Sequence, residues 1–119
     1  NRQNMSLLSE VKTILTGLSL PVETGVFSKT PPDRYTVLTP LADTFDLFSD
    51  NTPEEDVEEL RISLFDKGNY LAVKRQITSA LLSSEITITD RRYIGHENDT
   101  GYHHYAIDVA KNYSLQEDD

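Results

Sequence analysis

The three histidines, His96, His103 and His104, are the residues of this chain best suited to metal or acid–base chemistry. His103 and His104 are neighbours in a segment that alternates like a strand, so their side chains point to opposite faces and cannot bind one ion together. His96 could approach one of them across a hairpin loop, with Asp99 as a further ligand. The pattern is more typical of exposed hairpin histidines, and we expect no functional metal site.

Other motifs of catalysis are missing from the sequence. Without cysteine there are no disulfides, thiolate nucleophiles or cysteine metal sites. Asp43, Asp46 and Asp50 lack the glycine and the closing glutamate of a calcium loop. No phosphate loop, Gly-rich dinucleotide turn, Gly-x-Ser-x-Gly or His-Glu-x-x-His occurs, and no nucleophile has a recognisable base beside it. We therefore predict no catalytic, cofactor-binding or metal-binding residues, no cofactor, and a protein that is not an enzyme.

Charge limits the classes of partner. The 119 residues include 11 Lys and Arg against 20 Asp and Glu, which gives a net charge of −9 and a pI near 4.6. This sign disfavours binding to nucleic acid phosphates and to anionic membranes. No apolar run approaches the roughly 20 residues that span a bilayer, and the polar N-terminus predicts no signal peptide. Neutral or basic protein surfaces are the expected partners.

Two features favour contact with another protein. Phe45, Leu47 and Phe48 lie in a polar segment, where they either fold back into the domain's own core or anchor another subunit, since aromatic residues dominate interface hot spots. Arg91 and Arg92 either form salt bridges to the chain's own acidic strand, of little energetic value, or pair with an acidic patch on a neighbouring copy. These five residues are the candidate contact residues.

Two segments have the periodicity of amphipathic helices. In the first, apolar residues recur at spacings of three and four between positions 7 and 18, with Ser6 as the N-cap and Gly17 as the stop. In the second, Asn69 caps a similar pattern that runs from position 70 to 82. Leu15 and Ile77 are predicted to be core residues of these helices.

Strand patterns account for most of the remainder. Strands are expected at 21–27, 34–41, 54–65, 85–93 and 102–113, the last two forming a hairpin around a Gly/Asn/Asp loop. Pro40 ends the second strand or places it at an edge, and the first half of the third strand is acidic and solvated. Residues 42–53 show no regular pattern, and we expect them to be mobile in the free protein and ordered on assembly.

These elements predict an α+β fold. It is a two-layer sandwich with two helices packed on a mainly antiparallel sheet of about five strands, in the order α-β-β-β-α-β-β. We expect a single domain at 5–113, residues 1–4 to be vector-derived or disordered before a natural start at Met5, and 114–119 to be an acidic flexible tail.

Several short sequence segments, here called phrases, follow one another along the chain as in the tail-completion proteins of long-tailed phages and prophages. The sequence thereby resembles the tail-to-head joining proteins and, more distantly, the tail terminators. The phrases are the helix Leu-Leu-Ser-Glu-Val at 7–11, the turn and strand Thr-Pro-Pro-Asp-Arg-Tyr-Thr-Val-Leu at 30–38, and Leu-Arg-Ile-Ser-Leu-Phe-Asp-Lys-Gly-Asn-Tyr at 60–70. The final hairpin contributes Asp-Arg-Arg-Tyr at 90–93 and Thr-Gly-Tyr-His-His-Tyr at 100–105. The resemblance covers about residues 5–113.

This resemblance implies a virion structural protein, assembled in the host cytoplasm and located at the head–tail interface. Copies would form a ring, commonly hexameric in the family, that caps the tail tube and joins it to the head connector. The implied partners are copies of itself, the tail tube protein and the head connector or stopper protein, with DNA only as cargo passing through the ring and no membrane. An acidic lining would let DNA slide. Because copies of charge −9 repel one another, we expect the isolated protein to be mostly monomeric.

Two alternatives remain open at this stage. One is another connector component of the same virion, such as a stopper between portal and tail. The other is a small enzyme or regulatory domain with the same layered fold.

Overall fold

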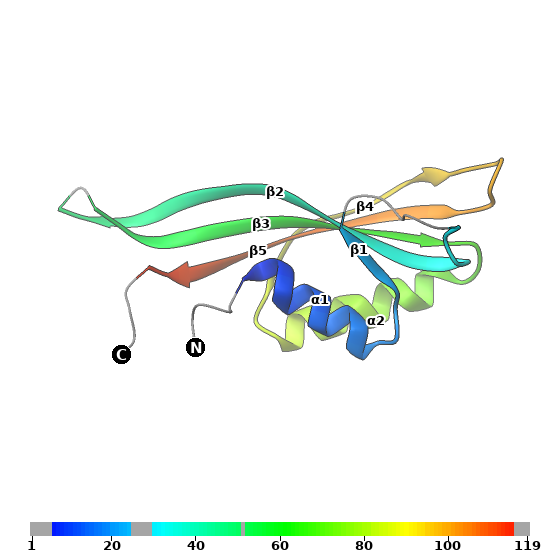
Figure 1. Cartoon of the computed structure of the whole chain (residues 1–119), viewed down its shortest axis with the longest axis horizontal. Coiled ribbons are helices and arrows are strands. Elements are labelled where there is room, and N and C mark those ends of the chain that lie inside the picture. The colour runs from blue at the N-terminus through cyan, green and yellow to red at the C-terminus, as the bar shows by residue number, and fades with distance from the viewer. Residues whose placement is uncertain (1–5, 25–29, 51, 116–119) are drawn as a thin grey trace.

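A computed structural model describes residues 6–24, 30–50 and 52–115 of the chain, which form two helices on one face of a five-stranded sheet (Figure 1). The elements are α1 (Leu7–Gly17), β1 (Val22–Thr24), β2 (Arg34–Ser49), β3 (Thr52–Asp66), α2 (Tyr70–Ser83), β4 (Thr87–His96) and β5 (His103–Ser114). The strands lie side by side in the order β1-β2-β3-β5-β4. Every pairing is antiparallel except that of β1 with β2. The predicted α+β class and element order are confirmed.

Both helices begin at the residues that the sequence indicates. The Ser6 hydroxyl accepts a hydrogen bond from the Ser9 backbone N–H at 3.1 Å, and the Ser9 hydroxyl accepts one from the Ser6 N–H at 3.2 Å. This reciprocal capping satisfies N–H groups that the first turn of α1 leaves without partners. At α2, the Asn69 side-chain oxygen accepts from the Ala72 N–H at 3.2 Å. α1 ends at Gly17, as predicted.

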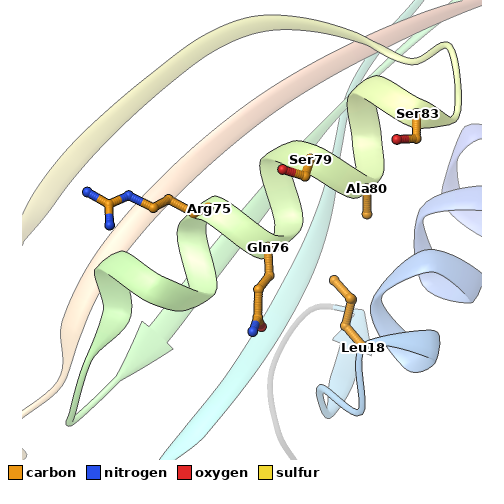
Figure 2. Close-up of a pocket in the computed structure, with 6 residues that line it drawn as sticks. All are labelled: Leu18, Arg75, Gln76, Ser79, Ala80 and Ser83. Carbon is orange, nitrogen blue, oxygen red and sulfur yellow. The ribbon is translucent and has the colours of Figure 1, made fainter.

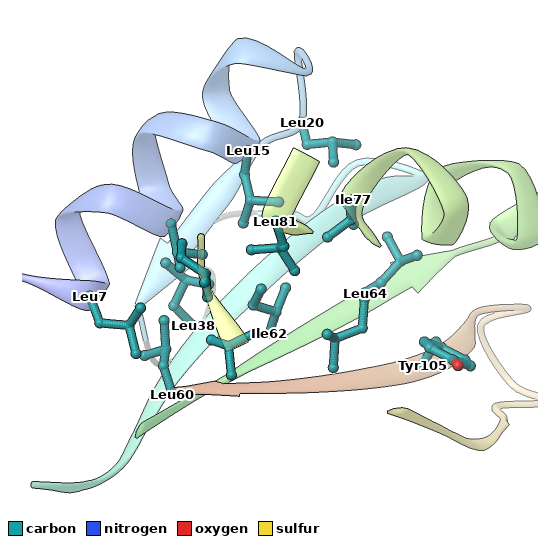
Figure 3. Close-up of a cluster of buried hydrophobic side chains, with 14 of the residues drawn as sticks. Leu7, Leu15, Leu20, Leu38, Leu60, Ile62, Leu64, Ile77, Leu81 and Tyr105 are labelled. Carbon is teal, nitrogen blue, oxygen red and sulfur yellow. The ribbon is translucent and has the colours of Figure 1, made fainter. Parts of the chain in front are cut away.

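The core lies between the helix layer and the sheet (Figure 3). Leu15 and Ile77 are fully buried, which confirms the prediction for both residues. Each helix contributes one buried row, and the sheet supplies alternate residues from three strands. The buried residues of the two layers include Leu7, Val11, Leu15, Val73, Ile77, Leu81, Leu38, Leu60, Ile62, Leu64, Ile107 and Val109. The side chains that alternate with these core residues point to the opposite face of the sheet. Among the described residues, no helix covers that face.

β2 is much longer than the sequence predicts, and this is the main correction to the predicted fold. The strand has 16 residues and continues through Pro40 into the segment that we expected to be irregular. Pairing with β3 explains the difference: the register continues from Arg34 opposite Asp66 to Ser49 opposite Thr52, with one shift after Pro40. Residues 42–53 are therefore mainly strand.

Pro40 is tolerated because it lies where β2 is an edge strand. β1 pairs with β2 only at residues 36–38, so beyond them one side of β2 pairs with no described strand. Proline within a sheet is confined to such edges and to irregularities. The prediction that Pro40 either ends the strand or lies at an edge is resolved in favour of the edge.

The remaining strands lie close to their predicted positions. β3 begins two residues earlier than expected, and the β4–β5 hairpin is confirmed. Gly101, with a φ of +86°, has the left-handed conformation that favours glycine, and its N–H donates to the Glu97 carbonyl at 2.7 Å. β1 falls inside the predicted 21–27 strand, whose residues 25–27 lie outside the described part, as do 1–5 and 116–119. None of the described helices has the length and apolar content needed to span a membrane.

Candidate functional site

The far halves of β2 and β3 form a projection that extends past the helices (Figure 1), and we call residues 42–50 and 52–59 the arm. β5 pairs with the β3 side of the arm from Ser114, opposite Glu55, onward. The arm contains eight carboxylates and no Lys or Arg: Asp43, Asp46, Asp50, Glu54, Glu55, Asp56, Glu58 and Glu59. It is the most acidic part of the molecule.

Phe45 is a large apolar residue of the arm that remains exposed. Its exposed fraction is 61%, which excludes the interpretation that it plugs the core of its own domain. Its β3 partner is Asp56. Asp56 is two residues from Glu58, which contacts α1, so Phe45 projects to the helix side of the sheet. The side chains of Leu47 and Phe48 lie outside what the structure describes.

Polar contacts join the arm to α1, and α1 in turn to β5, at the end of the arm nearest the helices. A Glu58 carboxylate oxygen accepts from the Leu7 N–H at 2.8 Å, at the start of α1. Glu10 of α1 accepts from the Lys111 ammonium at 2.8 Å and from the Tyr113 hydroxyl. Burial opposes ionisation of Glu10, but these two hydrogen bonds outweigh it and lower the pKa of its carboxyl. The pKa of Tyr113 is raised, first by burial and then by its bond to Glu10.

The predicted arginines lie on β4, the last strand at the opposite edge of the sheet. The Arg92 guanidinium donates to Asp90 of its own strand at 2.7 Å, so it does not bridge to the acidic strand as the simpler interpretation had it. Arg91 extends to the helix side, where its Nη1 lies 3.5 Å from the Thr78 hydroxyl of α2. Tyr93 and Ile94 follow with exposed fractions of 45% and 46%. The arm and these arginines are therefore separate surfaces, with β5 between β3 and β4.

The histidines follow the sequence-based prediction only in part: His96 is exposed, but His103 and His104 are partly buried rather than exposed. His103 and His104 lie on opposite faces of β5: His103 is 4.9 Å from the Tyr70 ring of α2, and His104 stacks on Phe65 at 4.2 Å. His96 approaches His103, with ring centroids 4.7 Å apart. In the described residues no three His, Asp or Glu side chains are grouped so that they could hold a metal ion.

An aromatic row on the sheet face away from the helices was not predicted. Tyr35 and Phe65 stack at 4.9 Å, Phe65 and His104 stack in turn, and Tyr102 lies edge-on to Tyr35 at 5.4 Å. The row is built from three strands, so its members become neighbours only through the register of those strands. The sequence alone could predict, from the alternation within each strand, only which face each side chain takes. His104 Nε2 is buried there and has no hydrogen-bond partner among the described residues. Burial lowers the pKa of His104.

Farther along this face, Arg61 and Asp108 form a two-point ion pair. The Arg61 Nε and Nη2 atoms donate to the two Asp108 oxygens at 2.7 and 3.0 Å. These bonds are the main reason that the pKa of Arg61 is raised. This paired hydrogen bonding between Arg61 of β3 and Asp108 of β5 favours the observed register of the two strands.

A hollow of about 500 Å³ lies where the end of α1 meets α2 (Figure 2). Its lining residues are Leu18, Arg75, Gln76, Ser79, Ala80 and Ser83. This lining provides one cation and no carboxylate or imidazole, so it does not bring together the acid and base that hydrolytic chemistry requires.

Comparisons with known proteins give distant likenesses to solved structures alone. No protein-family model matches the chain, and no curated protein is similar to it. Among solved structures, a chain described as "Virion of native gene transfer agent (GTA) particle" aligns with a TM-score of 0.47 and 10% sequence identity, over 94% of this chain and 87% of that chain. A likeness at this identity and TM-score assigns neither a family nor a function to this protein.

Proposed function

We propose that this protein is a non-enzymatic structural component of a phage-type virion, which completes the tail and joins it to the head connector as a ring. The observation that carries the proposal is the element order of the fold. The resemblance described above rests on short phrases in the order α-β-β-β-α-β-β, and the structure has that order.

The placement of the phrases supports the same proposal. Residues 60–70 contain the C-terminal half of β3, where Leu60, Ile62 and Leu64 are core residues, and the turn into α2. The phrases at 90–93 and 100–105 lie on β4, the hairpin loop and β5. The phrases at 7–11, 30–38, 60–70 and 100–105 therefore each include an element boundary and core residues, where a shared fold would constrain sequence. The phrase at 90–93 lies within β4 and is largely exposed.

The surface of the molecule fits an assembly role better than a catalytic one. An exposed aromatic residue on a charged projection offers both an anchor and electrostatic selectivity to a protein partner. The acidic arm also fits a conduit for DNA, because carboxylates repel phosphates and disfavour sticking. Protein partners of the ring would be its own copies, the tail tube and the head connector.

Electron microscopy of particles assembled with and without the protein tests this function. We expect particles that lack it to show heads and tails that are not joined and tail tubes without a uniform end. Joined particles in its absence would contradict the proposal. Tails of normal length beside heads that have lost their DNA would instead indicate a stopper.

A further inference from the structure

The described strands leave two edges of the sheet without a neighbouring strand. On one side, β1 covers β2 only at residues 36–38, so residues 39–49 have no described strand on their outer side. On the other side, β4 is the terminal strand and pairs only with β5 among the described strands. Exposed edges of this length are uncommon, because their unpaired N–H and C=O groups form a template for another strand.

The two edges differ in charge. The arm side of β2 belongs to the segment of eight carboxylates, whereas β4 carries Arg91 and Arg92 against one carboxylate, Asp90, which is bonded to Arg92. Two arms brought together would repel each other, since like charges on neighbouring strands are destabilising. An arm brought to a β4 edge would instead place carboxylates beside guanidinium groups.

The matching groups also lie on the same side of the sheet. Asp43 is paired with Glu58, whose carboxylate contacts the start of α1, so Asp43 projects to the helix side. Arg91 projects to the helix side as well, because it reaches Thr78 of α2. A rotation that repeats the molecule head to tail keeps all helices on one side of a continuous sheet, so Asp43 of one copy and Arg91 of the next would share a face.

Exposed apolar residues accompany both edges. Phe45 on the arm is 61% exposed, and Tyr93 on β4 is 45% exposed. Tyr93 contacts Tyr70 of α2 at 5.4 Å, which places its ring on the helix side, the side to which Phe45 also projects. Each edge therefore offers an apolar group and a charge on the same face, with charges of opposite sign.

From these observations we infer that copies of this protein join by strand addition, the outer edge of the β2 arm of one copy pairing with the outer edge of β4 of the next. The contact is head to tail, so it uses different surfaces on the two copies and closes into a ring if the rotation permits. This inference rests on the proposed ring and names the surfaces that form it. Pro40 and the register shift beside it leave residues 42–49 as the part of the edge suited to pairing.

Cross-linking of purified full-length protein tests the contact. Because the chain has no cysteine, Thr44→Cys on the arm and Thr89→Cys on β4 each introduce one thiol at an exposed position. The two variants, one of them isotope-labelled, are mixed at high concentration with a short bifunctional thiol reagent. Ser79→Cys, exposed on α2, is the matched control, and circular dichroism checks that each variant is folded.

We expect cross-links between position 44 of one copy and position 89 of another to exceed every other combination by about tenfold or more. Predominant 44–44 or 89–89 products would overturn the inference, as would 44–89 yields no higher than those of the control. Adding Arg91→Glu to the Thr89→Cys copy should lower the yield, and Asp43→Arg in the Thr44→Cys copy should restore it. Arg75→Glu on α2 makes the same charge change elsewhere and should lower the yield much less than Arg91→Glu does.

The result is independent of the microscopy experiment. Absence of arm-to-β4 products would exclude this contact while particles could still require the protein for joining. Conversely, head-to-tail products from a protein that particles do not require would support the contact and contradict the joining role.

Discussion

His104 makes one contact that stabilises the fold and buries one polar atom that destabilises it. Its ring stacks on Phe65, which is favourable, but its buried Nε2 atom finds no hydrogen-bond partner in the part of the chain that the structure describes. A buried imidazole of this kind resists protonation because the charged form loses its hydration. Among its charged neighbours, Arg61 also disfavours the charged form and Glu97 favours it.

The pH dependence of unfolding should report this residue. Because the pKa of His104 is lower in the folded protein than its ordinary value of 6.5, the unfolded chain binds the proton more readily. The stabilisation is therefore complete above about pH 6.5 and is lost as the pH falls toward the folded pKa, with a slope of at most about 1.4 kcal/mol per pH unit for one proton.

We expect His104→Phe to remove this part of the slope between pH 7 and pH 5 and to raise stability at the acidic end. His104→Gln should also remove the slope, but without that gain, because it keeps a polar group in the same place. Urea titrations at several pH values measure both effects. A wild-type slope retained in His104→Phe would show that another group is responsible.

At the scale of elements, the two helices depend on their buried rows. Leu15→Ala and Ile77→Ala should each lower the free energy of unfolding by about 2–5 kcal/mol, because each removes buried methyl groups and leaves a cavity. Leu82→Ala is the control on α2: its side chain is 63% exposed, so its effect should stay within about 0.5 kcal/mol. Thermal and urea unfolding would measure the three values, and equal losses in all of them would contradict the two-layer packing.

A substitution at an exposed residue of the arm should leave the fold intact and still reduce assembly. Phe45→Ser removes an exposed ring, so we expect a change in unfolding free energy within about 0.5 kcal/mol and a clear loss of joined particles. Leu82→Ser alters a similarly exposed residue on the helix layer and should leave joining intact. Melting temperatures together with particle counts by microscopy distinguish the two roles. Unfolding of Phe45→Ser would show that this ring is needed within its own domain.

The elements also show what the sequence could predict. The helices were predictable because a period of 3.6 and the caps at Ser6 and Asn69 are local signals. The strand character of residues 42–49 was missed because Pro40, Asp43 and Asp46 are poor local indicators of a strand, whereas the β3 half of the arm was predicted as a strand from residue 54. Here pairing with β3 makes the strand, a non-local effect that no short window contains.

The candidate site was predictable only in part for the same reason. Phe45, Arg91 and Arg92 stood out by residue type, and the structure shows that Phe45 is exposed and that the arginines lie on an edge strand. That the arm and β4 are opposite edges of one sheet follows from strand order. The row of Tyr35, Phe65 and His104 likewise depends on register, which the separate strand patterns leave open.

At the scale of the whole molecule, charge is expected to oppose assembly until a partner is present. Two copies of net charge −9 repel each other, and this repulsion extends over a Debye length of about 30 Å at 0.01 M salt but only about 8 Å at physiological salt. A single strand-edge contact is small, so at low salt the general repulsion should outweigh the local attraction between Asp43 and Arg91.

We therefore expect sedimentation to show mostly monomer at low ionic strength, with weak association that increases toward physiological salt and higher protein concentration. A tail or connector surface would hold several copies at once, which raises their effective concentration and lets many weak contacts close a ring. Arg91→Glu provides the comparison: it should reduce the association at physiological salt, whereas Arg75→Glu, with the same net charge, should reduce it less. A stable hexamer at low salt without any partner would contradict this account, because it would require contacts far stronger than two strand edges supply.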